Sequence, residues 1–173
     1  MKCPVCGDLC IRDAPEVIES VPSVFSRCRR CTFRVLDKSI PLRGRFYATP
    51  CECGKRFIDE VFAHLYVIMV EEGILSGNEP LKAVGSPLLH PGFFKAGPPF
   101  LPKDSLVLLS PLVTGSAAER IIKEVPEVRG VVRSGDFIPG ATDPSLATLP
   151  RTYELLAGCD VRAGVFPTGA GPL

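Results

Sequence analysis

The sequence predicts an α/β protein, α+β overall, with a cysteine-rich metal module, a buried helix and a small three-stranded parallel unit of Rossmann-like type. Three observations predict this fold. Seven cysteines lie in the first 53 residues, residues 56–72 carry apolar side chains at helical spacing, and the last seventy residues alternate apolar runs with helical patterns. We therefore expect four parts: a metal module at 1–57, a connecting helix at 58–73, an apolar crossover at 74–103 and an α/β unit at 104–173.

Composition and hydropathy indicate a globular chain with no membrane partner. Hydrophobic residues make up 46% of the 173 residues and charged residues 23%, which is enough apolar material for a core. The N-terminus has no apolar leader, and the longest apolar stretch, residues 61–70, is too short to span a bilayer. We expect a cytoplasmic protein. The absence of Gln and the single Asn, Asn78, suggest a thermophilic source.

The cysteine spacing favours metal ligation. Cys3-Pro-Val-Cys6-Gly and Cys28-Arg-Arg-Cys31 are two C-x2-C turns about twenty residues apart, which can present four thiolates in a tetrahedron. These residues resemble a zinc ribbon, and the resemblance covers only the N-terminal third. It implies a structural zinc site and no activity. In a reducing compartment, disulfides are the weaker alternative, with Cys10 and Cys159 as the candidates if the source is thermophilic.

A third cysteine pair leaves open whether the module holds one zinc ion or two. Cys51 and Cys53 could replace one knuckle of the first site or begin a second site. With Cys10, the module supplies seven thiol ligands, and His64 in the following helix could supply an eighth. Iron and iron–sulfur ligation use the same thiolates, but their usual clustered spacings are absent, so zinc is preferred.

The middle of the chain predicts a buried helix followed by an apolar connection. Residues 56–72 place two rows of apolar side chains at i, i+3 and i+4, and Gly73 marks the end of the helix. Residues 74–103 are rich in Pro and Gly but carry several Leu and Phe side chains, unlike a solvated linker. We expect them to lie extended over the domain surface. The apolar 86–101 segment is a candidate surface for a protein partner or for homo-oligomer formation.

The last seventy residues predict alternating strands and helices, at 105–110, 117–124, 128–132, 150–157 and 160–166. In a parallel sheet, the loops after the first and third strands lie at the same edge, where α/β proteins often bind ligands. A nucleotide-like cofactor such as S-adenosylmethionine could bind there, and its candidate contacts are Thr114, Gly115, Ser116, Asp136, Thr168 and Gly169. No G-x-G-x-x-G or Walker motif supports this site, and a Thr-Gly-Ser helix cap needs no ligand.

Charge patterning suggests an anionic partner for the metal module. Residues 1–57 carry eleven Lys and Arg against six Asp and Glu, whereas residues 58–173 carry nine against thirteen. The excess of arginines near the Cys28 knuckle, interleaved with aromatic residues, suits RNA or DNA. Opposite charges could equally dock the two halves on each other.

Two function classes follow from these observations. The first is a non-catalytic zinc-binding module for nucleic acid or protein. The second is an enzyme or enzyme subunit that binds a nucleotide-like cofactor. No catalytic set of side chains is evident in the sequence.

Overall fold

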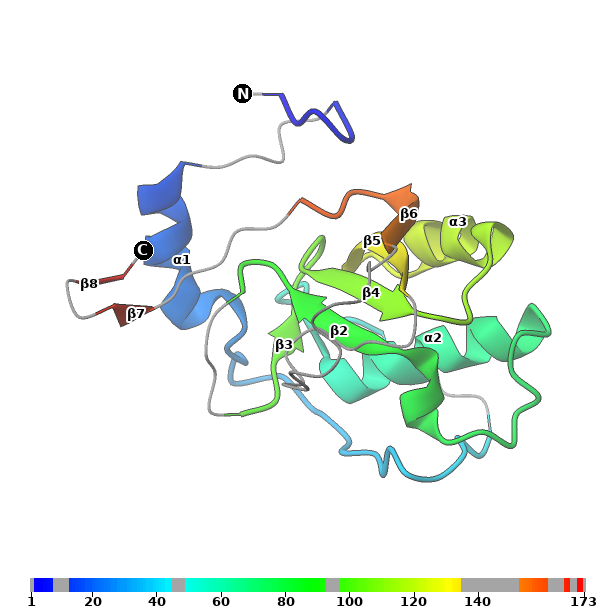
Figure 1. Cartoon of the computed structure of the whole chain (residues 1–173). Helices are drawn as coiled ribbons and strands as arrows, with labels where there is room; N and C mark the ends of the chain where they lie inside the picture. Colours follow the sequence, from blue (N-terminus) through cyan, green and yellow to red (C-terminus); the bar gives the residue numbers. More distant parts are fainter. Residues whose placement is uncertain are drawn as a thin grey trace.

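The computed structural model describes residues 2–7, 13–44, 49–92, 97–134, 153–161, 167–168 and 171–172. Their helices and strands follow the chain in Figure 1 as α1 (Ala14–Val24), β1 (Arg56–Phe57), α2 (Ile58–Glu71), the 3-10 turn η1 (Leu81–Val84), β2 (Ser86–Leu89), β3 (Phe100–Leu101), β4 (Leu106–Ser110), α3 (Gly115–Glu124), β5 (Val128–Ser134), β6 (Tyr153–Gly158), β7 (Pro167–Thr168) and β8 (Gly171–Pro172). The chain is therefore a mixed α+β protein.

The main sheet is mixed, with strand order β2-β4-β5-β6. β4 and β5 pair in parallel through the α3 crossover, as the sequence predicted for residues 105–132. β2 and β6 pair antiparallel at the two edges. The Rossmann-like unit is thus supported only by its first β-α-β segment, and the all-parallel sheet is corrected to a sheet with one parallel pair.

The helix predicted at residues 150–157 is wrong over its described part, because residues 153–158 form β6. Six residues give little length for a stable isolated helix, whereas pairing along β5 satisfies their backbone groups. Pairing with a distant strand is a tertiary effect that local periodicity does not report. The strand predicted at 160–166 lies mostly outside the described residues.

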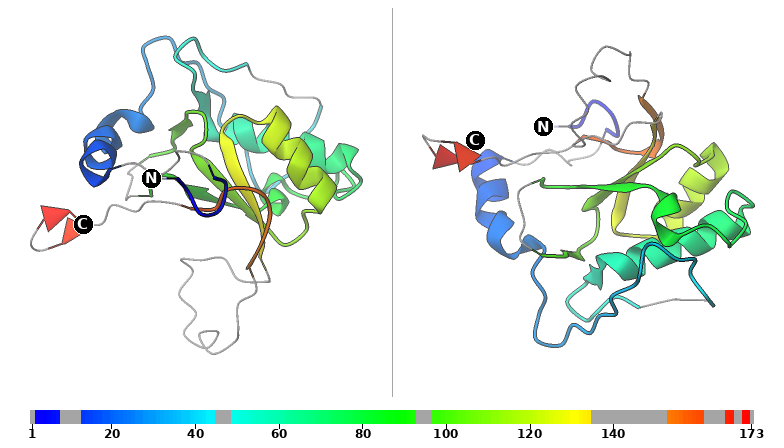
Figure 2. Two further views of the ribbon diagram at one scale, coloured as in Figure 1. Left: turned by 90° about the horizontal axis from the view of Figure 1, so that it is seen from above. Right: turned by 60° about the horizontal axis from the view of Figure 1, so that its bottom comes forward.

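The predicted buried helix is confirmed as α2. Most of its residues are buried, and it lies beside α3 against one face of the sheet in both views of Figure 2. Leu65 of α2, Ile121 of α3 and Val131 of β5 belong to one hydrophobic core. Phe25, from the cysteine-rich part, and Phe100, from the crossover, belong to the same core. None of the described helices is both long and apolar enough to cross a bilayer.

In the cysteine-rich part, β-prone runs at residues 23–26, 32–36 and 45–48 predict a small sheet, and the described residues depart from it. Residues 23–26, expected as a strand, form the end of α1 and the turn after it, and residues 32–36 have no regular structure. Pro15 lies in the first turn of α1, where proline is favourable, so this helix start was readable from the sequence. The third expected strand, residues 45–48, lies outside the described residues.

The crossover contains more structure than the sequence predicted. β2 adds to the edge of the main sheet beside β4, and β3 pairs with β1. Phe100 and Leu101 of β3 are buried. This part of the apolar 86–101 segment therefore packs inside the chain, and residues 93–96 lie outside the described residues.

A buried ion pair joins β1 to the turn before β5. Arg56 donates from Nε to Oε1 of Glu127 at 3.1 Å and from an η nitrogen to Oε2 at 2.6 Å. Both side chains are almost fully buried, at 4% and 1% exposure. Burying either charge alone is costly, and the two hydrogen bonds of a bidentate pair offset the desolvation of both groups. Removal of one partner therefore leaves the other charge buried and uncompensated.

We predict that Glu127→Gln lowers the free energy of unfolding by about 3–5 kcal/mol, because it leaves the Arg56 charge buried without a counter-charge. Glu154→Gln is the matched control, since Glu154 pairs with Arg133 at the surface. Its cost should stay below about 1 kcal/mol. Urea unfolding of both variants measures the difference, and equal costs would contradict the assignment of Arg56 and Glu127 as a structural pair.

Candidate metal centres

Four cysteines converge in the N-terminal third, and we call them the four-cysteine site: Cys28, Cys31, Cys51 and Cys53. All four sulfurs lie within 4.8 Å of one another. The Cys28 sulfur is 3.7 Å from that of Cys51 and 3.6 Å from that of Cys31, and Cys31 lies 3.6 Å from Cys53. At a zinc–sulfur distance of about 2.3 Å, the edge of a tetrahedron is about 3.8 Å. The cluster could therefore hold a zinc ion with little rearrangement.

Local turns position these thiols. The amide of Cys31 donates to the carbonyl of Cys28 at 3.3 Å, and the amide of Gly54 donates to that of Cys51 at 2.7 Å. Gly54 has φ of 76°, a left-handed conformation that glycine adopts without strain. Because these turns close locally, each cysteine pair presents both sulfurs on one side.

The pKa values of two thiols of this site are shifted in opposite directions. The amide of Arg30 donates to the Cys28 sulfur at 3.3 Å and lowers the pKa of Cys28 to about 7. Burial raises the pKa of Cys31 to about 12. A neighbouring thiolate makes a second ionisation unfavourable at these distances, whereas a divalent cation favours four thiolates together.

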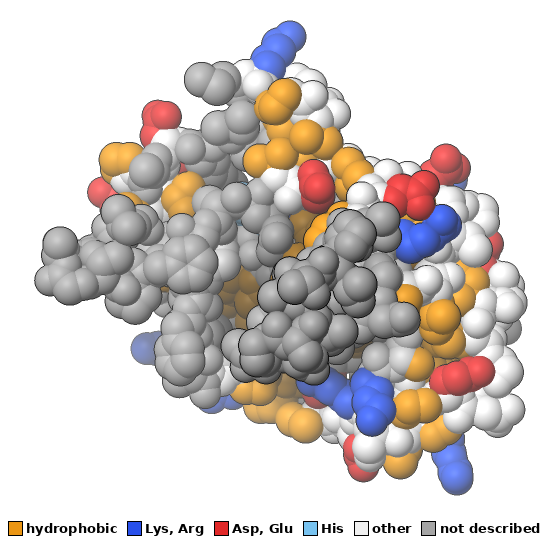
Figure 3. All heavy atoms as spheres, viewed as in Figure 1, with side chains coloured by type: hydrophobic (Ala, Val, Ile, Leu, Met, Phe, Trp, Pro, Cys, Tyr) orange, Lys and Arg blue, Asp and Glu red, His pale blue; other side chains and the backbone are white. Residues whose placement is uncertain are grey.

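A second cluster joins the N-terminal segment to the end of β6, and we call it the three-cysteine site: Cys3, Cys6 and Cys159. The sulfurs of Cys3 and Cys159 lie 3.7 Å apart, again close to a tetrahedral edge. Cys3 and Cys159 are buried, whereas Val5, which lies between Cys3 and Cys6 in the turn, is 45% exposed. Figure 3 shows hydrophobic side chains gathered at the top of the molecule, where Figure 1 places residues 2–7. A bound metal would thus fix a segment that buries little apolar surface.

Two glycines bring Cys159 to this position. A Cβ at Gly130 would lie 2.3 Å from the carbonyl oxygen of Cys159, and one at Gly158 would lie 2.2 Å from that of Arg129. The amide of Cys159 also donates to the carbonyl of Arg129 at 2.7 Å. The backbones of β5 and of the residues after β6 therefore approach too closely for any side chain at either glycine.

The structure pairs the predicted ligands differently from the zinc-ribbon interpretation. Cys28 and Cys31 lie with Cys51 and Cys53, and Cys3 and Cys6 lie with Cys159, so the set Cys3, Cys6, Cys28 and Cys31 is not brought together. Spacing identifies the C-x2-C knuckles but does not say which knuckles share a metal ion, because about twenty residues, helix α1 among them, separate the first knuckle from the second. Cys159 was singled out only as a disulfide candidate. Cys10 lies outside the described residues.

His64 belongs to neither cluster. Its Nδ1 lies 3.1 Å from an η nitrogen of Arg56, which can only donate, so Nδ1 accepts. Burial, and then the positive charge of Arg56, lower the pKa of His64. The His64 ring therefore accepts a hydrogen bond from the arginine of the Arg56–Glu127 pair. Among the described residues it belongs to no group that could hold a metal ion.

The predicted nucleotide site is not assembled by the described residues. Thr114 is the N-cap of α3, and its side chain accepts from the amide of Ala117 at 3.4 Å, while its hydroxyl contacts that of Ser116 at 3.2 Å. Gly115 is the first residue of the helix. Thr168 lies in β7, which Figure 1 places near α1 and apart from α3. Asp136 and Gly169 lie outside the described residues.

Comparison of the chain with protein-family models, with curated proteins and with solved structures finds no match. The distances, burial and ligand chemistry of the two cysteine sites are therefore the basis for a function.

We predict that single cysteine variants fall into two groups by zinc content. Cys28→Ser and Cys53→Ser should lose the same ion, and Cys3→Ser and Cys159→Ser the other, because each pair shares a cluster. The double variant Cys28→Ser/Cys53→Ser should then lose one equivalent, and Cys28→Ser/Cys159→Ser should lose two. Elemental analysis per chain, with thermal melting alongside, measures this. If Cys3→Ser and Cys28→Ser each lost the same single ion, the zinc-ribbon set of Cys3, Cys6, Cys28 and Cys31 would be right. If the protein contained iron, the assignment of zinc would be wrong.

We predict that His64 titrates below its unfolded pKa of about 6.5, with Nδ1 unprotonated at neutral pH. Because the native pKa is lowered, its contribution to stability is complete above about pH 6.5 and is lost as pH falls toward the native pKa. Nitrogen-15 NMR of the imidazole measures both quantities, and His64→Gln should remove that part of the pH dependence. A native pKa at or above 6.5 would contradict the burial of the His64 ring beside the Arg56 guanidinium.

Proposed function

We propose that this chain is a zinc-binding protein whose four-cysteine site presents a basic loop to single-stranded nucleic acid, and whose three-cysteine site also binds zinc. One observation carries the nucleic-acid proposal: exposed basic side chains gather on the segment that the four-cysteine site would fix. The zinc part is supported by the tetrahedral spacing of the sulfurs in both clusters.

The loop has a marked excess of positive charge. Over the described residues 26–44 and 49–55, the exposed acidic side chains are Asp37 and Glu52. The exposed basic ones are Arg27, Arg29, Arg30, Arg34, Lys38 and Arg43. Arg30 pairs with Glu52, and Lys38 pairs with the buried Asp59 at 2.8 Å. Even after these pairs, the loop retains basic side chains suited to phosphate contacts.

Phe33 supplies an aromatic surface within this charge. It is 45% exposed, although its ring packs against Phe57 at 5.0 Å and Phe100 at 5.7 Å between centroids. The guanidinium carbon of Arg27 lies 5.6 Å from the centroid of the Phe33 ring. Stacking on such a ring, with arginines beside it, is the usual way in which proteins bind single-stranded nucleic acid without strong sequence preference.

A metal would give this loop its shape. Residues 31–37 form neither helix nor strand, and backbone hydrogen bonds hold them to α2: the amide of Leu36 donates to Asp59 at 3.0 Å, and the backbone of Arg34 bonds to Glu60. A loop with so little regular structure loses much entropy on ordering. Four metal–sulfur bonds at its two ends would offset that cost before nucleic acid binds.

We predict that the zinc-loaded protein binds a fluorescein-labelled 20-nucleotide uridine RNA, and that affinity falls steeply between 50 and 200 mM salt. Arg29→Ala and Arg43→Ala should each flatten the slope of log K against log salt by about 0.7, the value for one phosphate contact on a single strand. Lys123→Ala is the matched control, because Lys123 is exposed on α3 and is not part of the loop. Fluorescence anisotropy measures all four proteins.

Phe33→Ala tests the stacking surface separately. Loss of one stacked base should weaken binding by about 1–3 kcal/mol with little change in salt slope. Thermal melting shows whether the variant stays folded, since Phe33 also packs on two core rings. RNA binding that is absent, or equally weakened by Lys123→Ala, would overturn the proposal and favour a protein partner for this surface.

A further inference from the structure

Arg129 of β5 is a buried charge with no carboxylate beside it among the described residues. The residue is 8% exposed, and its Nε is buried without a hydrogen-bond acceptor. Arg56, which is also buried, differs because it forms a bidentate pair with Glu127. A guanidinium stays charged throughout the pH range of folded proteins, and burying a charge without a counter-charge is costly. Arg129 therefore needs a negative partner.

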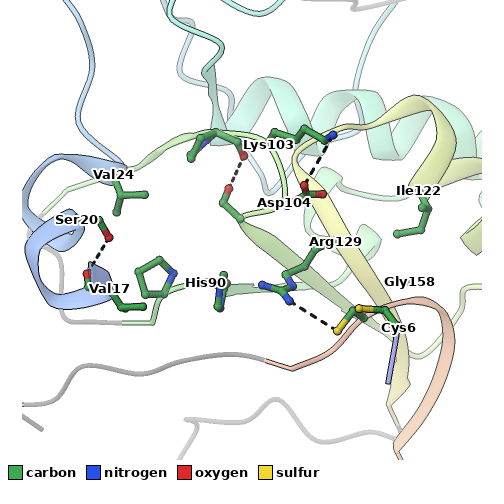
Figure 4. A pocket seen from close by; sticks show the side chains of 14 residues that line it. Cys6, Val17, Ser20, Val24, His90, Lys103, Asp104, Ile122, Arg129 and Gly158 are labelled. Atoms are coloured by element: carbon green, nitrogen blue, oxygen red, sulfur yellow. Dashed lines mark hydrogen bonds and ion pairs between the residues drawn. The ribbon is translucent and has the colours of Figure 1, made fainter. Parts of the chain in front are cut away.

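The described partner of Arg129 is the sulfur of Cys159. One η nitrogen lies 3.7 Å from that sulfur, and a dashed line marks the contact in Figure 4. The amide of Cys159 also donates to the carbonyl of Arg129 at 2.7 Å, so the backbone fixes the two residues side by side. Both line a cavity of about 770 Å³ whose wall includes Asp104, but that carboxylate lies 4.0 Å from Lys103. The guanidinium is thus directed toward a metal-ligand candidate.

Burial gives the three-cysteine site a need for a counter-charge that the four-cysteine site lacks. Cys3 and Cys159 are 2% and 5% exposed, whereas Cys53 of the four-cysteine site is exposed. Three thiolates around a divalent ion carry at least one net negative charge, whatever neutral or anionic group completes the coordination. Water and salt screen such a charge at an exposed site but much less at a buried one. A buried cation beside Cys159 would compensate it.

We propose that Arg129 is the counter-charge of the metal ion at the three-cysteine site and donates a hydrogen bond to the metal-bound sulfur of Cys159. The buried guanidinium and the buried anionic metal complex would then offset each other's desolvation. Donors outside the ligand set orient metal ligands and tune their affinity for the ion. The inference rests on zinc binding at the three-cysteine site, as proposed above, and is independent of nucleic-acid binding.

Zinc competition with a chromophoric chelator tests the inference in the full chain loaded with two zinc equivalents. Arg129→Gln should weaken the binding of one equivalent about ten- to hundredfold, the usual loss when a donor to a metal ligand is removed, and leave the other unchanged. Arg129→Lys retains the positive charge and should recover most of that affinity. Melting of the zinc-loaded variants shows that they remain folded.

Cobalt substitution adds a spectroscopic measurement that a purely structural role of Arg129 would not change. The sulfur-to-cobalt charge-transfer absorption of one ion should move to longer wavelength in Arg129→Gln, because a sulfur that has lost a hydrogen bond is a better electron donor. Arg133→Gln is the matched control, since Arg133 lies on the same strand but pairs with Glu154 at the surface. It should leave both zinc affinities and the cobalt spectrum unchanged.

Four outcomes would overturn the inference. Arg129→Gln could leave both zinc equivalents at their original affinity, or weaken both alike. Arg129→Lys could bind zinc as weakly as Arg129→Gln, which would show that the charge does not matter. Arg133→Gln could have the same effect as Arg129→Gln. An unmodified chain that binds one zinc equivalent, held by Cys28, Cys31, Cys51 and Cys53, would instead overturn zinc binding at the three-cysteine site itself, and this inference with it.

Discussion

Mutual repulsion among clustered thiolates is the constraint on which the N-terminal third depends. Sulfurs held 3.6–3.7 Å apart cannot all ionise without a cation between them, because each thiolate disfavours the ionisation of its neighbours. A divalent ion converts that repulsion into binding free energy. In the described part of residues 2–55, α1 is the only regular element, so metal ligation would determine where the loops around it lie.

Burial of apolar side chains stabilises the rest of the chain. One core extends from Phe25 through α2 and β3 to β5. The buried Arg56–Glu127 pair joins β1 to the turn before β5. The cysteine-rich part contributes Phe25 and, at its edge, Cys31 to this core. The metal module is therefore packed on the sheet-containing part through apolar contacts as well as through any metal at Cys159. The division of the chain into four parts, at 1–57, 58–73, 74–103 and 104–173, stays a prediction.

Sequence reasoning succeeded where a single local pattern decides the structure. The α2 periodicity and the β4-α3-β5 alternation were both predictable, because apolar spacing alone identifies them. Prediction from the sequence failed where residues far apart in the chain determine the structure. β6 depends on pairing with β5, and the two ligand sets depend on which cysteine knuckles meet in space. One feature of the sequence bears on the position of Cys159. Its neighbour Gly158 and the distant Gly130 lack side chains, which allows the two backbones to approach closely. A sequence alone does not show that these glycines face each other.

The two described cysteine clusters predict two separate metal centres, one local to the second and third knuckles and one joining the N-terminal segment to β6. Cadmium-113 NMR of the cadmium-substituted protein tests this prediction most directly, because scalar coupling identifies the cysteines bound to each ion. We expect two resonances, one coupled to the β protons of Cys28, Cys31, Cys51 and Cys53, and the other to those of Cys3, Cys6 and Cys159. A single resonance, or one coupled to both Cys3 and Cys28, would contradict it.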